Sequence, residues 1–271
     1  RNIAVGYRAG TALVDDTDNT ILGYDAGLKA IGSYCTYIGS KAADNVTSGQ
    51  HNTAIGYNAF GNAEADEEQN VAIGSGAMSS VQQGDGGGDA DNNVAIGYNA
   101  LLGGDFTGND RQLAGNIAIG AYALDATAAT TTNEHIGTIA IGHQALTGLT
   151  YGASNTAIGY QSGYTLSTQA FNTLVGYRAG YALASTDCVM IGTFAGEKQD
   201  AAGSCVYIGS SAGRYWDASS NVAIGLEAMY GGGSAGSPSA NTGTSNTAIG
   251  YNAMKGATAA ATGANNVAIG K

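Results

Sequence analysis

Apolar residues recur along the chain in a short phrase that ends in glycine. The phrase is built on Asn-x-Ala-Ile-Gly, occurs fifteen times, and its copies are 16 to 25 residues apart. We number positions from the glycine, so that minus one precedes it and plus one follows it. The glycines are Gly6, Gly23, Gly39, Gly56, Gly74, Gly97, Gly120, Gly142, Gly159, Gly176, Gly192, Gly209, Gly225, Gly250 and Gly270. This spacing is typical of single coils of a β-solenoid and too short for paired helices.

Each phrase has the composition of a short strand, for example at residues 3–5, 53–55 and 94–96. Position minus one is always Ile, Val or Leu, and position minus three is always β-branched. Position minus two is Ala in most copies and a larger apolar residue in the others. Successive residues of a strand point to opposite faces, so both faces are apolar and both need a cover. We therefore predict an all-β parallel solenoid of about fifteen coils.

The two faces are expected to have different partners. We expect the β-branched residues to fill the inside of each coil, and the alanines to form an apolar stripe on the outside. An exposed stripe of that length would be a liability for a monomer, and small residues allow subunits to approach closely. The sequence thus predicts self-association through the alanine face. The substitution Ala118→Asp or Ala157→Asp should block this association.

The glycine and the asparagine of the phrase are expected to be structural. An invariant glycine indicates a backbone bend where a side chain would not fit, and the asparagines should form a ladder between coils. Position plus four is glycine in some coils and a larger apolar residue in others, in a second short segment of the coil. The repeat residues singled out for these roles are Gly56, Gly97, Gly120, Gly159, Gly225, Asn52, Asn93 and Asn221.

The charge of the chain bears on its partners. Ten basic and 21 acidic residues give a formal net charge of −11, and the basic residues are scattered along the sequence. This disfavours nucleic acids and anionic membrane surfaces, which bind clustered Lys and Arg. No apolar run is long enough to cross a membrane as a helix, so we expect no membrane insertion.

Long connections offer candidate contact sites. Those at 79–92, 102–115 and 125–137 are consecutive and should form one lobe, with a second from 230–245 and 255–265. Projecting loops on a rigid scaffold often carry binding, although they could equally be tolerated insertions. Five aromatic residues outside the repeat positions are candidate receptor contacts, and each could instead pack on its own coil. They are Phe106, Tyr151, Tyr215, Trp216 and Tyr230.

Other chemistry is sparse. Asp85, Asp89 and Asp91 lie in a Gly-rich stretch similar to a calcium-binding β-roll loop, but it occurs once, so we expect no cofactor there. The three cysteines all replace the phrase's Asn; Cys188 and Cys205 are one coil apart, within disulfide range, yet we expect free thiols. His51, His135 and His143 occupy unrelated positions, without zinc-ligand spacing or a phosphate-binding loop. We therefore expect no enzymatic activity.

Phrases such as those at 52–56, 93–97 and 221–225 resemble the head repeats of trimeric autotransporter adhesins of the YadA type, and related repeats of phage tail fibres. The resemblance spans the whole chain, although these coils are longer than the usual adhesin repeat. It implies a left-handed parallel β-roll, a homotrimer around a common axis, and binding to extracellular surfaces. The recurrent Tyr after the glycine is closer to the phage fibres.

The sequence therefore favours residues 1–271 as a single repeat domain, a segment of a longer fibre. Its expected function is attachment to a host cell surface through a glycan or protein receptor, as part of a phage tail fibre on the virion surface. The alternatives are a bacterial surface adhesin of the trimeric autotransporter type, also extracellular, and a passive structural spacer without a ligand of its own.

Overall fold

The computed structural model describes residues 1–63, 67–81, 90–103, 112–126, 135–199, 203–231, 243–256 and 263–271. The chain divides into two compact units. Unit 1 comprises Arg1–His143 with Thr150–Ala153, and unit 2 comprises Gln144–Leu149 with Ser154–Lys271. The described residues contain strands and turns and no helix.

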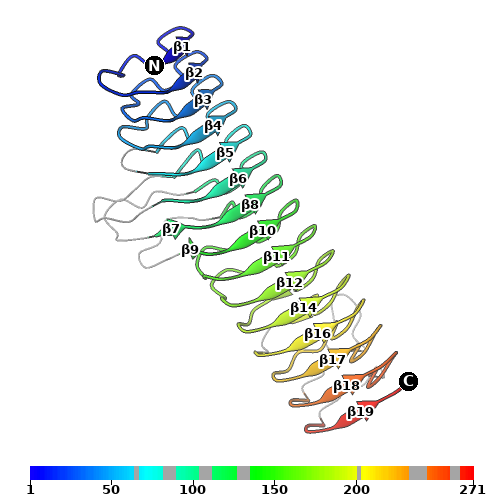
Figure 1. Cartoon of the computed structure of the whole chain (residues 1–271). Helices are drawn as coiled ribbons and strands as arrows, with labels where there is room; N and C mark the ends of the chain where they lie inside the picture. The colour runs from blue at the N-terminus through cyan, green and yellow to red at the C-terminus, as the bar shows by residue number, and fades with distance from the viewer. Residues whose placement is uncertain are drawn as a thin grey trace. The chain divides into compact units, whose positions relative to one another are not determined.

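Unit 1 is built around a parallel sheet of eight three-residue strands, one for each of its first eight phrases (Figure 1). Neighbouring strands pair in register, so that Ala72 lies beside Ala95 and Ala95 beside Ala118. The strands, in spatial order, are β1 (Ile3–Val5), β2 (Thr20–Leu22), β3 (Thr36–Ile38), β4 (Thr53–Ile55), β5 (Val71–Ile73), β6 (Val94–Ile96), β8 (Ile117–Ile119) and β10 (Ile139–Ile141). A small second sheet pairs β7 (Leu113–Ala114) with β9 (His135–Ile136).

Unit 2 repeats this plan with the remaining seven phrases. Its strands also pair in parallel and in register, as between Leu174 and Met190 or between Ala223 and Ala248. They are β11 (Thr156–Ile158), β12 (Thr173–Val175), β14 (Val189–Ile191), β16 (Val206–Ile208), β17 (Val222–Ile224), β18 (Thr247–Ile249) and β19 (Val267–Ile269). A second sheet pairs β13 (Ala182–Leu183) with β15 (Lys198–Gln199).

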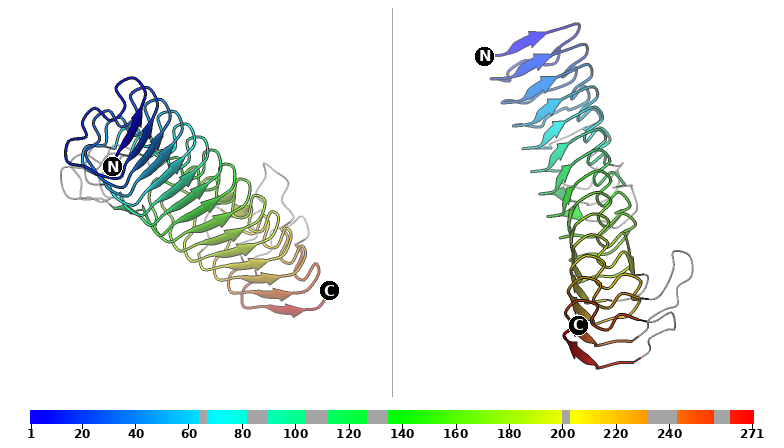
Figure 2. Two further views of the ribbon diagram at one scale, coloured as in Figure 1. Left: turned by 45° about the horizontal axis from the view of Figure 1, so that its top comes forward. Right: turned by 90° about the vertical axis from the view of Figure 1, so that its right-hand side faces the viewer.

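Within each unit, each three-residue strand is followed by a turn, and the chain then returns to begin the next three-residue strand one coil further along (Figure 2). Parallel strands joined this way, each paired with the strands of neighbouring coils, define a β-solenoid. The expected all-β parallel solenoid is therefore confirmed, with one coil for each phrase.

The phrase glycines adopt backbone φ angles between +123° and +143°. L-residues rarely adopt such angles. Space is also lacking, because a Cβ added to Gly97 would lie 2.7 Å from the carbonyl carbon of Gly120 in the next coil. The same approach recurs between Gly159 and Gly176. Each glycine therefore lets two coils meet backbone to backbone.

An asparagine precedes the strand in most phrases, and its side chain links its coil to the next, as Asn52 does by two hydrogen bonds. The Asn52 side chain accepts from the Asn70 backbone N–H at 2.9 Å and donates to the Glu67 carbonyl at 2.7 Å. Where cysteine replaces asparagine, part of this link remains, because the Cys205 thiol donates to the Ala218 carbonyl at 3.3 Å. Asn52, Asn93 and Asn221 are all buried.

The assignment of the two strand faces made from the sequence is wrong. Position minus two points into the coil: Ala118 and Ala157 are fully buried, as are Tyr37 and Tyr207 at the same position. It shares the interior with position plus four, where Leu124 and its equivalents are also buried. The narrow space between these two segments explains the alanines. An Asp at Ala118 or Ala157 would thus disrupt the coil itself, and it does not test a subunit interface.

The β-branched residues at minus one and minus three line the outer face of the strands. Ile158 and Ile249 are 38 and 37 % exposed. All 30 residues at these two positions are Ile, Val, Leu or Thr, so the face carries no charge. We call this surface of each unit the outer apolar stripe.

Candidate functional site

The five aromatic candidates have different environments. Trp216 is 3 % exposed, and its indole N–H donates to the Gly243 carbonyl at 3.1 Å, so this residue packs against the coil and is not available to a receptor. Tyr151, in unit 1, is 41 % exposed. Phe106 lies outside the described residues, as do most of the long connections expected to form the lobes.

Tyr215 and Tyr230 belong to a larger polar group in unit 2. Their rings meet edge to face, with centroids 5.8 Å apart. Around them lie cations and aromatic rings from successive coils, all at positions plus two, plus five or plus six of the repeat. We call this group the basic-aromatic ladder. Its members are Tyr164, Arg178, Tyr181, Phe194, Glu197, Lys198, Arg214, Tyr215, Tyr230 and Lys255.

A buried carboxylate joins two arginines of the ladder. Glu197 is 2 % exposed, and Arg178 approaches one of its oxygens at 3.1 Å. Arg214, from the coil on the other side, approaches the second oxygen through Nε at 2.7 Å and through Nη2 at 2.6 Å. A buried charge costs several kcal/mol unless it is paired and hydrogen-bonded, so Glu197 fixes both guanidinium groups. The group of three keeps a net charge of +1.

Aromatic rings hold the cations in place from the other side. The Arg178 guanidinium lies 4.0 Å from the centroid of Tyr181, whose ring also stacks on Tyr164 at 5.0 Å. Arg214 lies 4.2 Å from the centroid of Phe194 and 5.0 Å from that of Tyr215. Such cation–π contacts contribute about 0.5 to 2 kcal/mol each.

The outer members of the ladder are more exposed. Lys198 is exposed to solvent, and its ammonium group lies 5.7 Å from the centroid of Tyr181. Lys255 lies 5.3 Å from the centroid of Tyr230 and forms an ion pair with Glu227. This hydrogen bond raises the pKa of Lys255. The ladder thus presents four cations over five coils.

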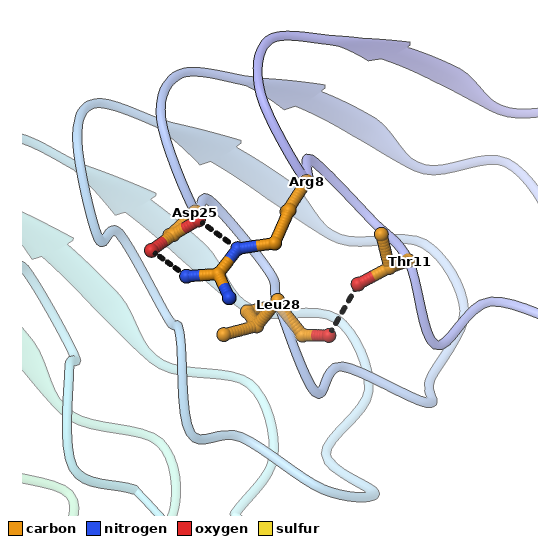
Figure 3. Close-up of polar contacts among 4 residues, drawn as sticks. All are labelled: Arg8, Thr11, Asp25 and Leu28. Atoms are coloured by element: carbon orange, nitrogen blue, oxygen red, sulfur yellow. Dashed lines mark hydrogen bonds and ion pairs between the residues drawn. The ribbon is translucent and has the colours of Figure 1, made fainter.

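Unit 1 uses the same repeat positions differently (Figure 3). At plus two, Arg8 forms a two-point ion pair with Asp25 of the next coil, with distances of 2.8 and 2.6 Å. The Arg8 hydrogen bonds lower the pKa of Asp25. At plus five, the Thr11 hydroxyl donates to the Leu28 carbonyl at 3.0 Å. Here one cation meets one carboxylate, so no positive charge is left over.

The charge of the chain is divided unequally between the units. Unit 1 contains five basic and 16 acidic residues, whereas unit 2 contains five of each. The whole net charge of −11 therefore belongs to unit 1. Sequence reasoning missed the ladder because the basic residues are far apart along the chain. Numbering each basic residue from the glycine of its own phrase would have placed Arg178, Lys198, Arg214 and Lys255 at plus two, plus five or plus six of their coils.

The three cysteines are free thiols, and all are buried. Burial raises the pKa of Cys35. A hydrogen bond with Cys205, together with burial, raises the pKa of Cys188. Thiolates are the reactive form of cysteine, so Cys35 and Cys188 are poorly suited to nucleophilic chemistry.

Of the calcium candidates, Asp85 and Asp89 lie outside the described residues, and the Asp91 carboxylate accepts from the Glu68 backbone N–H at 2.6 Å. Within the described ranges, no three His, Cys, Asp or Glu side chains are grouped as metal ligands would be. The same part of the chain contains no helix long and apolar enough to span a membrane.

Comparison of the sequence with protein-family models and with curated proteins finds no match in either set. The fold and the arrangement of its side chains therefore carry the functional argument.

Proposed function

We propose that the chain is a segment of a homotrimeric fibre that attaches to a cell surface, as part of a phage tail fibre on the virion. The outer apolar stripe carries this proposal. Each coil contributes two β-branched or aliphatic side chains to it, and Ile224 is still 37 % exposed. Exposed apolar surface of this extent marks an interaction site.

Copies of the same chain are the occupants that fit the stripe best. The stripe repeats in step with the coils, so an identical partner presents the same side chains at the same spacing. Its lack of charge suits the buried core of a permanent interface. Closed symmetry, which homo-oligomers favour, allows three stripes to cover one another around a shared axis.

Attachment is the function that fits a rigid repeat scaffold with loops and side chains displayed away from its core. A bacterial adhesin of the trimeric autotransporter type shares these properties and is the alternative. Genes for tail and baseplate proteins beside this one would favour the tail fibre, and a membrane anchor on the same chain would favour the adhesin. In the third alternative the segment is a passive spacer, and cell binding by the purified segment would exclude that function.

The assembly can be tested by light scattering on size-separated protein. We expect a trimer for the native chain. Ile158→Asp and Ile224→Asp should each yield a folded monomer, because three carboxylates would be buried together at the interface. Val14→Asp is the matched control, since Val14 is 85 % exposed and lies in a connection. A monomeric native chain would overturn the proposal.

A further inference from the structure

We propose that the basic-aromatic ladder binds an acidic polysaccharide, with sugar carboxylates as the recognised groups. The inference rests on the proposed attachment function and names its ligand class. Its starting point is that Arg178, Lys198, Arg214 and Lys255 bring four of the ten basic residues of the chain into one group. This occurs in the unit with equal numbers of basic and acidic residues, whereas unit 1 carries the whole net charge of −11.

Arg178 and Arg214 each keep N–H donors that Glu197 does not use. A guanidinium group has five N–H donors, and Glu197 occupies only part of those of Arg178 and Arg214. Their side chains are 28 and 21 % exposed, so both reach the surface. The Nε of Arg178 is buried and has no hydrogen-bond partner. Planar guanidinium groups match the geometry of carboxylates, which they bind through two parallel hydrogen bonds.

The donors are also held before any ligand arrives. Glu197 holds the two guanidinium groups by ion pairs, and the rings of Tyr181 and Phe194 contact them as well. Arginine side chains normally lose conformational freedom on binding, and that loss reduces affinity. In the ladder most of this ordering has occurred during folding.

The spacing favours a polymer over a single sugar. Arg178, Lys198 and Arg214 belong to three successive coils, whose strands are about 4.8 Å apart. This distance is similar to the length of one pyranose unit in an extended polysaccharide. A polyuronate chain lying along the unit would therefore reach cations of several coils with carboxylates of different sugar units, whereas a single sugar would contact fewer of them. Several weak contacts on one chain add up by multivalency.

A nucleic acid is a poorer fit. Proteins bind single strands through aromatic faces on which bases stack, but the faces of Tyr181 are covered by Tyr164 and Arg178. The four cations are also few for a phosphate backbone. In this proposal the rings position the cations, whereas from the sequence Tyr215 and Tyr230 are candidates for direct receptor contact.

The test measures binding of the full chain to polygalacturonate at low ionic strength, with neutral dextran and single-stranded DNA as comparison polymers. Lys198→Gln removes an exposed cation and should weaken binding by about threefold to tenfold. The triple variant Arg178→Gln, Glu197→Gln, Arg214→Gln removes both arginines without leaving a buried carboxylate unpaired. It should weaken binding by more than about tenfold. The matched control, Arg8→Gln with Asp25→Asn, removes the equivalent pair of unit 1 and should leave affinity unchanged.

Selective, salt-sensitive binding of polygalacturonate that follows this order supports the proposal. Absence of polygalacturonate binding by the native chain overturns it, as does equal binding of dextran or of DNA. So does a triple variant that binds like the native chain. Light scattering on the same samples separates the two proposals. A trimer that does not bind polygalacturonate would contradict only the proposed ligand, whereas a monomer would contradict the proposed fibre assembly.

Discussion

The ring of Tyr207 occupies the space beside Gly213, where a Cβ added to the glycine would overlap the ring. The two residues are at positions minus two and plus four of one coil. The same relation joins Leu174 to Gly180. Where position minus two is Ala, as in Ala118, position plus four is usually large, as in Leu124. In most coils the two positions thus share one interior space; where both are small, as at Ala157 and Gly163, side chains of the neighbouring coils such as Leu146 and Leu174 reach into it.

This shared volume predicts a compensating pair of substitutions. Ala118→Leu alone should destabilise the fold by about 1–3 kcal/mol through overpacking, and Leu124→Gly alone by about 2–5 kcal/mol through the cavity it leaves. Together they recreate the arrangement of Leu174 and Gly180, so the double variant should recover at least about 1 kcal/mol relative to the sum. A double-mutant cycle in chemical denaturation measures the coupling, and simple additivity would contradict a shared interior.

The close approach of the phrase glycines predicts a position-specific cost for alanine. Gly97→Ala should destabilise the chain by about 3 kcal/mol or more, because the residue has a φ of +139° and its Cβ would lie 2.7 Å from the Gly120 carbonyl carbon. Gly115 is the control: its φ is +66° and a Cβ there meets nothing within 4 Å. Alanine at Gly115 should cost only about 1–2 kcal/mol. Thermal denaturation compares the two, and equal losses would contradict this account.

The asparagine links predict that a single amide stabilises two coils at once. Asn52→Ala would leave the Asn70 backbone N–H and the Glu67 carbonyl without the partners that Asn52 provides. Each buried unpaired group costs about 1–3 kcal/mol, so the loss should exceed that of Asn2→Ala, which removes the equivalent two hydrogen bonds from an exposed asparagine that water can replace. Equilibrium denaturation measures both variants. Equal stability of Asn52→Ala and the native chain would argue against the links.

The raised pKa values of Cys35 and Cys188 predict both their reactivity and a pH dependence. In the native state, Cys35 and Cys188 should not react with a disulfide reagent at pH about 8, and all three cysteines should react after unfolding. The unfolded thiols ionise near pH 8.5, whereas the folded ones stay protonated. Their contribution to stability is therefore fully present below that pH and decreases as the pH rises above it. Thiol titration with and without denaturant, and denaturation at several pH values, check the two statements.

The repeat period and the apolar phrase were sufficient to predict the solenoid, because each coil buries its own strand in the same way. The inward face could not be assigned from polarity, since neither face carries polar residues. The coils with the large residues Ile21, Leu174 or Met190 at minus two have glycine at plus four. This pairing of sizes would have identified minus two as the inward position, because only residues that share a space need compensating sizes.

The candidate site was harder to predict. Tyr215 and Tyr230 were singled out as isolated aromatic residues, but Tyr215 contacts Tyr230 of the next coil, and Tyr230 contacts Lys255 of the coil after that. Only the stacking of the coils brings these residues close. Trp216 could not be distinguished from an exposed aromatic residue by its sequence position, and the structure places it inside the coil.

Two glycine contacts show how freely the connections can vary. Gly74 and Gly97 are 23 residues apart, and Gly209 and Gly225 only 16, yet a Cβ on the first of either pair would lie 2.7 or 2.6 Å from the carbonyl carbon of the second. The backbone meets in the same way whatever length of chain lies between. The length of a connection therefore does not affect the register of the coils. The connections can change in length and sequence, one coil at a time, while the strands stay aligned.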